Sequence, residues 1–181
     1  RRRILAELVP LAFNDSMQVA RALGHGWDEK RAAMTLDTEY IDGSYPALHH
    51  PLNREGSKDT DELRLQLLPK LQELLRETGF DGMLWLAGLG NPVAFANFLL
   101  REDAQGGKRW YWVDLESGVP ALFPAHPGAL LRVYLPLSAK YRAPLFDHTD
   151  TTRLTAWLTR NQARLDAGRV AGTTERLLSD C

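Results

Sequence analysis

The chain lacks features that mark several common classes of protein. It has one cysteine among 181 residues, Cys181, so no disulfide can form within the chain, as is typical of a reducing compartment. No apolar run approaches the roughly 20 residues of a membrane-spanning helix. The formal net charge of -1 gives no bulk attraction to nucleic acid or to an anionic membrane. We therefore expect a cytoplasmic protein with no transmembrane segment and no nucleic-acid partner.

The first residues, RRRIL, contain no initiator methionine, and no signal-like apolar region follows them. We expect that the numbering begins inside a longer gene product or that the chain was processed. The length fits one domain, or one large lobe with an appendage. Hydrophobic residues make up 44% of the chain and charged residues 25%, which is enough for a packed core beneath an ordinary charged surface.

Two short apolar runs, 95–100 and 110–115, organise the middle of the chain. Between them stand three residues that favour turns, Asp103, Gly106 and Gly107. This pattern predicts a β-hairpin.

Each run carries one polar residue near the same end of the predicted hairpin. Asn97 opens the first strand, and Asp114 closes the second. Amide and carboxylate oxygens brought side by side are ligands that a hard cation such as Mg²⁺ prefers. The sequence therefore predicts Asn97 and Asp114 as metal ligands.

The sequence NFLL from Asn97, followed by the hairpin and by WVDLESG around Asp114, resembles a pair of motifs in the protein-kinase-like superfamily. These are the catalytic-loop Asn and the metal-binding Asp. The bacterial small-molecule and lipopolysaccharide-core kinases are the most similar branch. The resemblance implies an α+β fold with a mainly helical kinase-like C-lobe whose β-hairpin carries the site. It also implies ATP and Mg²⁺ as cofactors.

The same resemblance leaves the catalytic residue unassigned. Five residues before Asn97, where the family has its catalytic-base Asp, stands Pro92, and Gly90-Asn91-Pro92 replaces the H-R-D motif. A Gly-rich loop followed by a V-A-I-K lysine is also missing from the chain. Glu116, two residues after Asp114, could add a carboxylate or bind a substrate hydroxyl.

The N-terminal part fits the same resemblance. Residues 2–23 are helical in pattern, and Asn14-Asp15-Ser16 interrupts the pattern and can cap a second helix through Leu23. This segment would correspond to the αC region, with Glu7 either pairing with a strand lysine or facing solvent. Residues 33–43 suit a strand that ends in T-E-Y-I-D-G, which resembles the kinase hinge; Glu39, Tyr40 and Ile41 would then bind the nucleotide. The domain organisation expected is a partial N-lobe-like segment over 1–43 and a C-lobe-like helical domain over 44–181.

The remaining predicted elements are helices. A leucine stripe predicts a helix over 60–78 that ends at Gly79, with Pro69 kinking it or splitting it in two. Further helices are predicted over 128–137, 151–167 (with a cap among residues 147–150) and 173–178.

Two other groups of residues were weighed as sites. His49 and His50 are adjacent and have no third ligand nearby, which argues against a metal site. Arg132, Lys140 and Arg142 form a basic stretch that could receive a phosphorylated or acidic substrate, or could simply be a solvated surface.

Three functional interpretations follow. The first is an ATP- and Mg²⁺-dependent phosphotransferase acting on a small molecule or a lipopolysaccharide-type glycolipid. The second is a catalytically inactive pseudokinase that acts as a scaffold for a protein or lipid partner. The third is an α+β domain in which Asp114 caps a turn and Asn97 bonds to the backbone.

Overall fold

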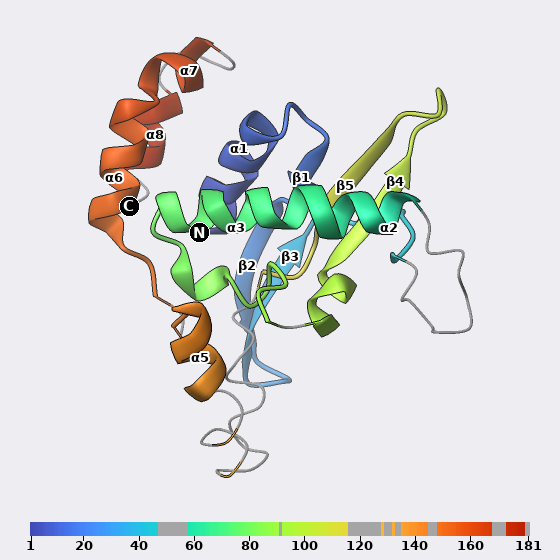
Figure 1. The fold of residues 1–181 in the computed structure, drawn as a ribbon, viewed down its shortest axis with the longest axis horizontal. Helices are drawn as coiled ribbons and strands as arrows, with labels where there is room; N and C mark the ends of the chain where they lie inside the picture. The colour runs from blue at the N-terminus through green and yellow to red at the C-terminus, as the bar shows by residue number, and fades with distance from the viewer. Residues whose placement is uncertain are drawn as a thin grey trace. The chain divides into compact units, whose positions relative to one another are not determined.

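The computed structural model describes residues 1–46, 58–90, 92–115, 128, 132, 135–144, 148–167 and 173–179. It is a mixed α+β structure (Figure 1). The chain divides into two compact units, one of Arg1–Tyr45 with Phe98–Val113 and one of Pro46–Asn97 with Asp114–Cys181. The hairpin, which the sequence interpretation grouped with residues 44–181, thus belongs to the same unit as the N-terminal segment.

A three-stranded sheet with the order β1-β5-β4 forms the centre of the first unit (Figure 1). The predicted hairpin is confirmed as β4 (Phe98–Glu102) and β5 (Lys108–Trp112), paired antiparallel. On the other side of β5, β1 (Met17–Val19) pairs with it in parallel. Helix α1 (Arg2–Ala12) packs against β1.

The helix predicted over residues 2–23 is confirmed only as far as Ala12. Its apolar stripe, including Ile4, Leu5, Leu8 and Val9, is buried as the spacing indicates. Asn14 and Asp15 then take the left-handed conformation with φ of 48° and 63°, which ends the helix. The prediction of a second helix through Leu23 is wrong, because these residues gain strand partners from distant parts of the chain.

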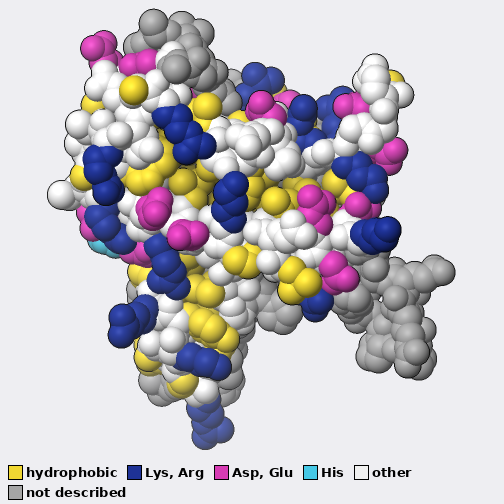
Figure 2. All heavy atoms as spheres, turned by 45° about the horizontal axis from the view of Figure 1, so that its top comes forward, with side chains coloured by type: hydrophobic (Ala, Val, Ile, Leu, Met, Phe, Trp, Pro, Cys, Tyr) yellow, Lys and Arg dark blue, Asp and Glu magenta, His cyan; other side chains and the backbone are white. Residues whose placement is uncertain are grey.

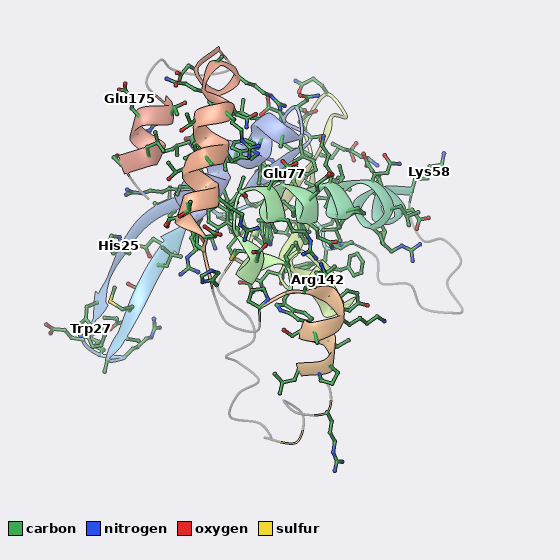
Figure 3. All side chains as sticks on the ribbon, turned by 60° about the vertical axis from the view of Figure 1, so that its left-hand side comes forward. His25, Trp27, Lys58, Glu77, Arg142 and Glu175 are labelled. Carbon is green, nitrogen blue, oxygen red and sulfur yellow. The ribbon has the colours of Figure 1, made fainter. Side chains whose placement is uncertain are left out.

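Strands β2 (Ala22–Asp28) and β3 (Ala33–Thr38) form a separate two-stranded antiparallel ribbon. The predicted strand from residue 33 is confirmed over Ala33–Thr38. No residue of either strand is buried, and four large apolar side chains of the ribbon are exposed: Leu23, Trp27, Met34 and Leu36. Figure 3 shows Trp27 near the turn of this ribbon and His25 further along the strand. An isolated two-stranded ribbon has little stability of its own.

A continuous helical run over 58–77 dominates the second unit, as the leucine stripe predicts. It consists of α2 (Lys58–Glu62), the π-helix η1 (Leu63–Leu67) and α3 (Leu68–Glu77). Pro69 neither splits nor ends the run. A proline has no N–H to donate to the carbonyl of the residue four positions earlier, and its ring clashes with that carbonyl. The wider π-turn before Pro69 accommodates both effects.

The end of α3 and the start of α6 are fastened together. Gly79 ends the helix as predicted and takes the left-handed conformation, with φ of 76°. Its carbonyl oxygen accepts a hydrogen bond from the Asp150 N–H (2.8 Å). The Asp150 carboxylate caps α6 (Thr151–Arg160) by accepting from the Arg153 N–H (3.0 Å). The Arg153 guanidinium donates to Asp150, to Asp81 and to the Arg76 carbonyl. One arginine therefore joins both helix ends.

The remaining helices are short. Two 3-10 turns, η2 (Asp81–Met83) and η3 (Pro92–Asn97), precede the hairpin. The predicted helix over 151–167 breaks at Asn161 into α6 and α7 (Gln162–Ala167), and the last predicted helix is confirmed as α8 (Thr173–Ser179). The helix predicted over 128–137 lies largely outside the described residues, which show α5 at Leu135–Tyr141.

The burial of the leucine stripe predicts unequal effects of two matched substitutions. Leu71 is 0% exposed and Leu65, on the same helical run, is 63% exposed. Leu71→Ala should lower the free energy of unfolding by about 2–5 kcal/mol, because it opens a cavity. Leu65→Ala should change it by less than about 0.5 kcal/mol. Urea denaturation followed by circular dichroism measures both, and equal effects would contradict the burial described here.

The cap at Asp150 predicts a pH dependence. Hydrogen bonds from the Arg153 backbone N–H and guanidinium lower the pKa of Asp150 from its ordinary value of 3.8. The ionised carboxylate therefore stabilises the fold above that value, and the stabilisation disappears as the pH falls through the lowered pKa. Asp150→Asn keeps a capping oxygen and removes the charge. The melting temperature of the wild type should exceed that of Asp150→Asn at neutral pH, and the difference should shrink as the pH falls below 3.8. A difference independent of pH would contradict this account.

Candidate functional site

The open end of the β4-β5 hairpin brings together the two segments that carry the predicted metal ligands. The ladder ends at the pair Phe98 and Trp112. Asn97 is the last residue of η3, directly before β4, and Asp114 follows β5 by two residues. Both therefore lie just outside the strands on which the sequence placed them.

The Asn97 side chain is held by its nitrogen. Its Nδ2 donates to the Leu86 carbonyl (3.1 Å), which is the backbone bond that the third interpretation expected. This bond fixes the orientation of the amide and turns its oxygen away from Leu86. The Asn97 Oδ1 accepts no hydrogen bond from the described residues, so it can serve as an oxygen ligand.

Asp114 is exposed, so its carboxylate can reach solvent ions. Among the described residues, no three His, Cys, Asp or Glu side chains gather as a metal-binding group. The other candidate ligands, Glu116, His49 and His50, lie outside the described residues.

Pro92 begins η3, and the whole turn reads PVAFAN. No residue of this turn can accept a proton as a catalytic base. The structure therefore places no acid at the position that the resemblance assigns to that base.

The predicted hinge segment is anchored at both ends within the first unit. The Glu39 N–H donates to the Arg21 carbonyl (2.8 Å), and the Glu39 carboxylate accepts from the Arg21 guanidinium (3.2 Å). At the other end, Ser44 and Leu100 exchange two backbone hydrogen bonds (2.9 and 2.8 Å). The segment between these anchors is therefore fixed in place.

The backbone between the anchors keeps its polar groups available. From Tyr40 to Gly43, no N–H or C=O group hydrogen-bonds to another described residue. Tyr40 is 86% exposed, whereas Ile41 is 5% exposed. Tyr40, Asp42 and Gly43 are exposed, so their backbone groups can bond to water or to a ligand.

Ile41 belongs to a small apolar cluster together with Ala20, Leu99 and Tyr111, against which Val113 packs. Leu99 stands two residues after Asn97, and Val113 stands directly before Asp114.

Sequence reasoning missed Arg2, which supports this cluster. Its guanidinium donates to the Ala20 carbonyl (2.8 Å) and to the Val113 carbonyl (3.1 Å), and the residue is 9% exposed. In the run RRR, nothing marks one arginine as buried. Only the apolar spacing that follows it, which sets the buried face of α1, could have indicated Arg2.

The basic stretch predicted at Arg132, Lys140 and Arg142 includes one ring contact. The Lys140 ammonium lies 5.2 Å from the centroid of the Tyr141 ring. Figure 2 shows basic and acidic side chains interspersed over the upper part of the face that it presents, whereas its lower part carries basic side chains without acidic ones.

Comparisons with known proteins identify no relative: no family model, no curated protein and no solved structure matches this chain. In the part of the chain that the structure describes, no helix has the length and apolar character needed to span a membrane.

The Ser44–Leu100 anchor predicts an unequal cost for two glycine substitutions. A Cβ on Gly43 would lie 2.9 Å from the Leu100 carbonyl oxygen, closer than side chains tolerate, whereas a Cβ on Gly26 would lie 3.7 Å from the Thr35 hydroxyl. Gly43→Ala should lower the free energy of unfolding by about 1–3 kcal/mol, because the backbone must move. Gly26→Ala should stay within about 1 kcal/mol of the wild type. Thermal unfolding of both variants checks this; equal stabilities would show that the segment is not held against β4.

Proposed function

We propose that this chain is a kinase-like domain that binds ATP with Mg²⁺ and transfers a phosphoryl group to a small molecule or a glycolipid. One observation carries the proposal. A backbone segment, Tyr40 to Gly43, whose polar groups bond to no other described residue, includes Ile41, which packs in the apolar cluster with Ala20, Leu99 and Tyr111.

The hinge segment supplies what a purine base needs. A base has flat apolar faces and an edge of hydrogen-bond donors and acceptors, and ligand sites commonly combine apolar side chains with a few backbone N–H and C=O groups. Ile41 and its cluster provide apolar surface, and the backbone of residues 40–43 provides the polar partners. The anchors at Glu39 and Ser44 hold these groups in place before a ligand binds.

The open end of the hairpin supplies what the phosphates need. Asn97 Oδ1 and the Asp114 carboxylate would hold Mg²⁺, which neutralises charge on the phosphate oxygens. Phosphoryl transfer depends mainly on positioning and on charge stabilisation. These are the roles we assign to the anchored amide of Asn97 and to the exposed carboxylate of Asp114.

A second candidate function is a nucleotide-binding pseudokinase that acts as a scaffold. The observation in its favour is the turn PVAFAN, which places Pro92 where a kinase has its catalytic base. In this case the nucleotide would stabilise the domain without turnover, and the partner would be a protein or a glycolipid.

Both candidates require a magnesium-dependent interaction with ATP. Millimolar ATP should raise the melting temperature of the protein in the presence of Mg²⁺, and chelation of the metal should abolish the shift. Asp114→Ala should remove the shift, because it deletes the charged ligand. Asn97→Ala should weaken it less, because a neutral amide contributes less to binding a hard cation.

Asp61→Ala is the matched control, since Asp61 is a helix-surface acid on α2 and has no part in the proposed site. It should keep the full shift. If ATP with Mg²⁺ leaves the melting temperature unchanged, both candidate functions are wrong. If the shift persists in Asp114→Ala, the assignment of the metal ligand is wrong.

An ADP-release assay separates the two candidates. A phosphotransferase should release ADP slowly, either by hydrolysing ATP or by transferring its terminal phosphoryl group. Pro92→Asp should increase the rate of ADP release, since it places an acid at the position of the catalytic base. A protein that binds ATP but shows no turnover in either form is the pseudokinase.

A further inference from the structure

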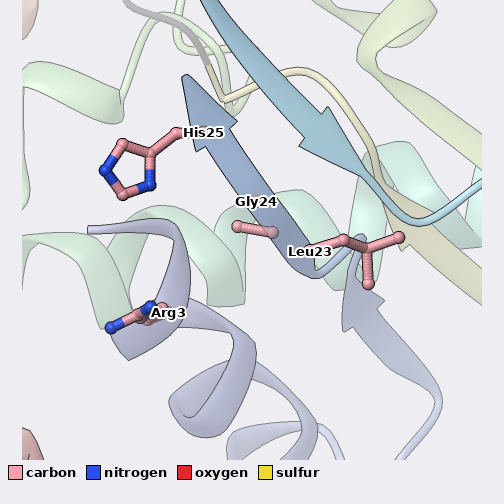
Figure 4. Close-up of a pocket in the computed structure, with 5 residues that line it drawn as sticks. Arg3, Leu23, Gly24 and His25 are labelled. Carbon is pink, nitrogen blue, oxygen red and sulfur yellow. The ribbon is translucent and has the colours of Figure 1, made fainter.

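An open pocket of about 170 Å³ lies between the first turn of α1 and strand β2, within the first unit (Figure 4). Its lining residues are Arg3, Ala22, Leu23, Gly24 and His25. None of them belongs to the site proposed for ATP.

A β-bulge shapes the wall that β2 contributes. The register of β2 against β3 shifts between Ala22 and Gly24. Bulges redirect side chains and are frequent next to functional sites. Figure 4 shows Arg3 and His25 reaching to the same side of β2, while Leu23 extends to the other side.

Both polar side chains of the pocket are available to a ligand. Arg3 and His25 are exposed, and neither makes a hydrogen bond or an ion pair with another described residue. Other charged groups of the ribbon are occupied or face elsewhere. Glu39 pairs with Arg21, and Asp37 lies beside Gly24, whose side of the strand is opposite to that of His25.

We propose that this pocket binds a phosphate group. The Arg3 guanidinium offers a fork of donors suited to two oxygens of one phosphate, and the His25 imidazole offers a further donor from a different element. Donors from two directions match a tetrahedral oxyanion better than a flat carboxylate. The pocket has room for the phosphate and the first atoms of the molecule that carries it.

The test is a titration of the isotopically labelled protein with inorganic phosphate at constant ionic strength, followed by amide NMR. Shifts should concentrate at Arg3 and at residues 22–25, and chloride should not produce them. Arg3→Gln and His25→Gln should each weaken phosphate binding by about tenfold, because each removes a charged or strong donor. Both side chains are exposed, so neither substitution should disturb the fold. Amide signals away from the substituted residue should therefore keep their wild-type positions in each variant.

Arg31→Gln is the matched control. Arg31 is an exposed arginine at the turn of the same ribbon, paired with Asp28 (3.5 Å). It should bind phosphate as the wild type does. If phosphate produces no shifts at these residues, or if Arg31→Gln weakens binding as much as Arg3→Gln, the proposal is wrong.

Two further arms identify the source of the phosphate group. Glycerol 3-phosphate represents a soluble phosphate ester, and vesicles containing phosphatidic acid represent a lipid headgroup. If Arg3→Gln weakens the binding of one of these two probes, the proposal is supported and that probe identifies the source. If both probes bind and Arg3→Gln weakens neither, the proposal is wrong.

Discussion

The stacked pair of Phe98 and Trp112 determines where the candidate ligands Asn97 and Asp114 leave the hairpin. The two rings are 5.9 Å apart and nearly parallel, at 14°, and both residues are 0% exposed. They form the last pair of the hairpin ladder. The Trp112 indole N–H is buried with no acceptor among the described residues, so packing and stacking, not a hydrogen bond, hold the ring in place. Because this pair closes the ladder, the chain enters the hairpin at Asn97 and leaves it towards Asp114.

The same strand connects the hairpin to the N-terminal segment. The Trp112 carbonyl accepts from the Ala20 N–H (3.0 Å), and Val19 is its partner in the parallel pairing of β1 with β5. Arg2 adds bonds to the Ala20 and Val113 carbonyls. One strand thus aligns α1, β1 and the apolar cluster around Ile41.

Local patterns predicted the parts of this fold that depend on neighbouring residues. Asp103, Gly106 and Gly107 indicated the hairpin turn, and Gly79 marked the end of the long helix, because their preferences are set by backbone conformation alone. The sequence did not indicate a strand at residues 17–19, since β1 acquires its bonds from β5, more than ninety residues away. The buried Arg2 and the Ser44–Leu100 anchor were missed for the same reason. The oxygen ligands at Asn97 and Asp114 could be proposed from sequence, but the bond that orients the Asn97 amide comes from Leu86, which no sequence pattern indicates.

The central claim is that Asn97 and Asp114 hold a divalent cation on ATP and that the backbone of residues 40–43 binds ATP. Manganese, a paramagnetic substitute for magnesium, tests it most directly. When Mn²⁺ and ATP are added together, amide signals of residues next to Asn97 and Asp114 should broaden strongly, and those of Tyr40 to Gly43 should shift with ATP even when a diamagnetic metal replaces manganese. Broadening centred elsewhere in the chain, or no response of residues 40–43 to ATP, would contradict the account.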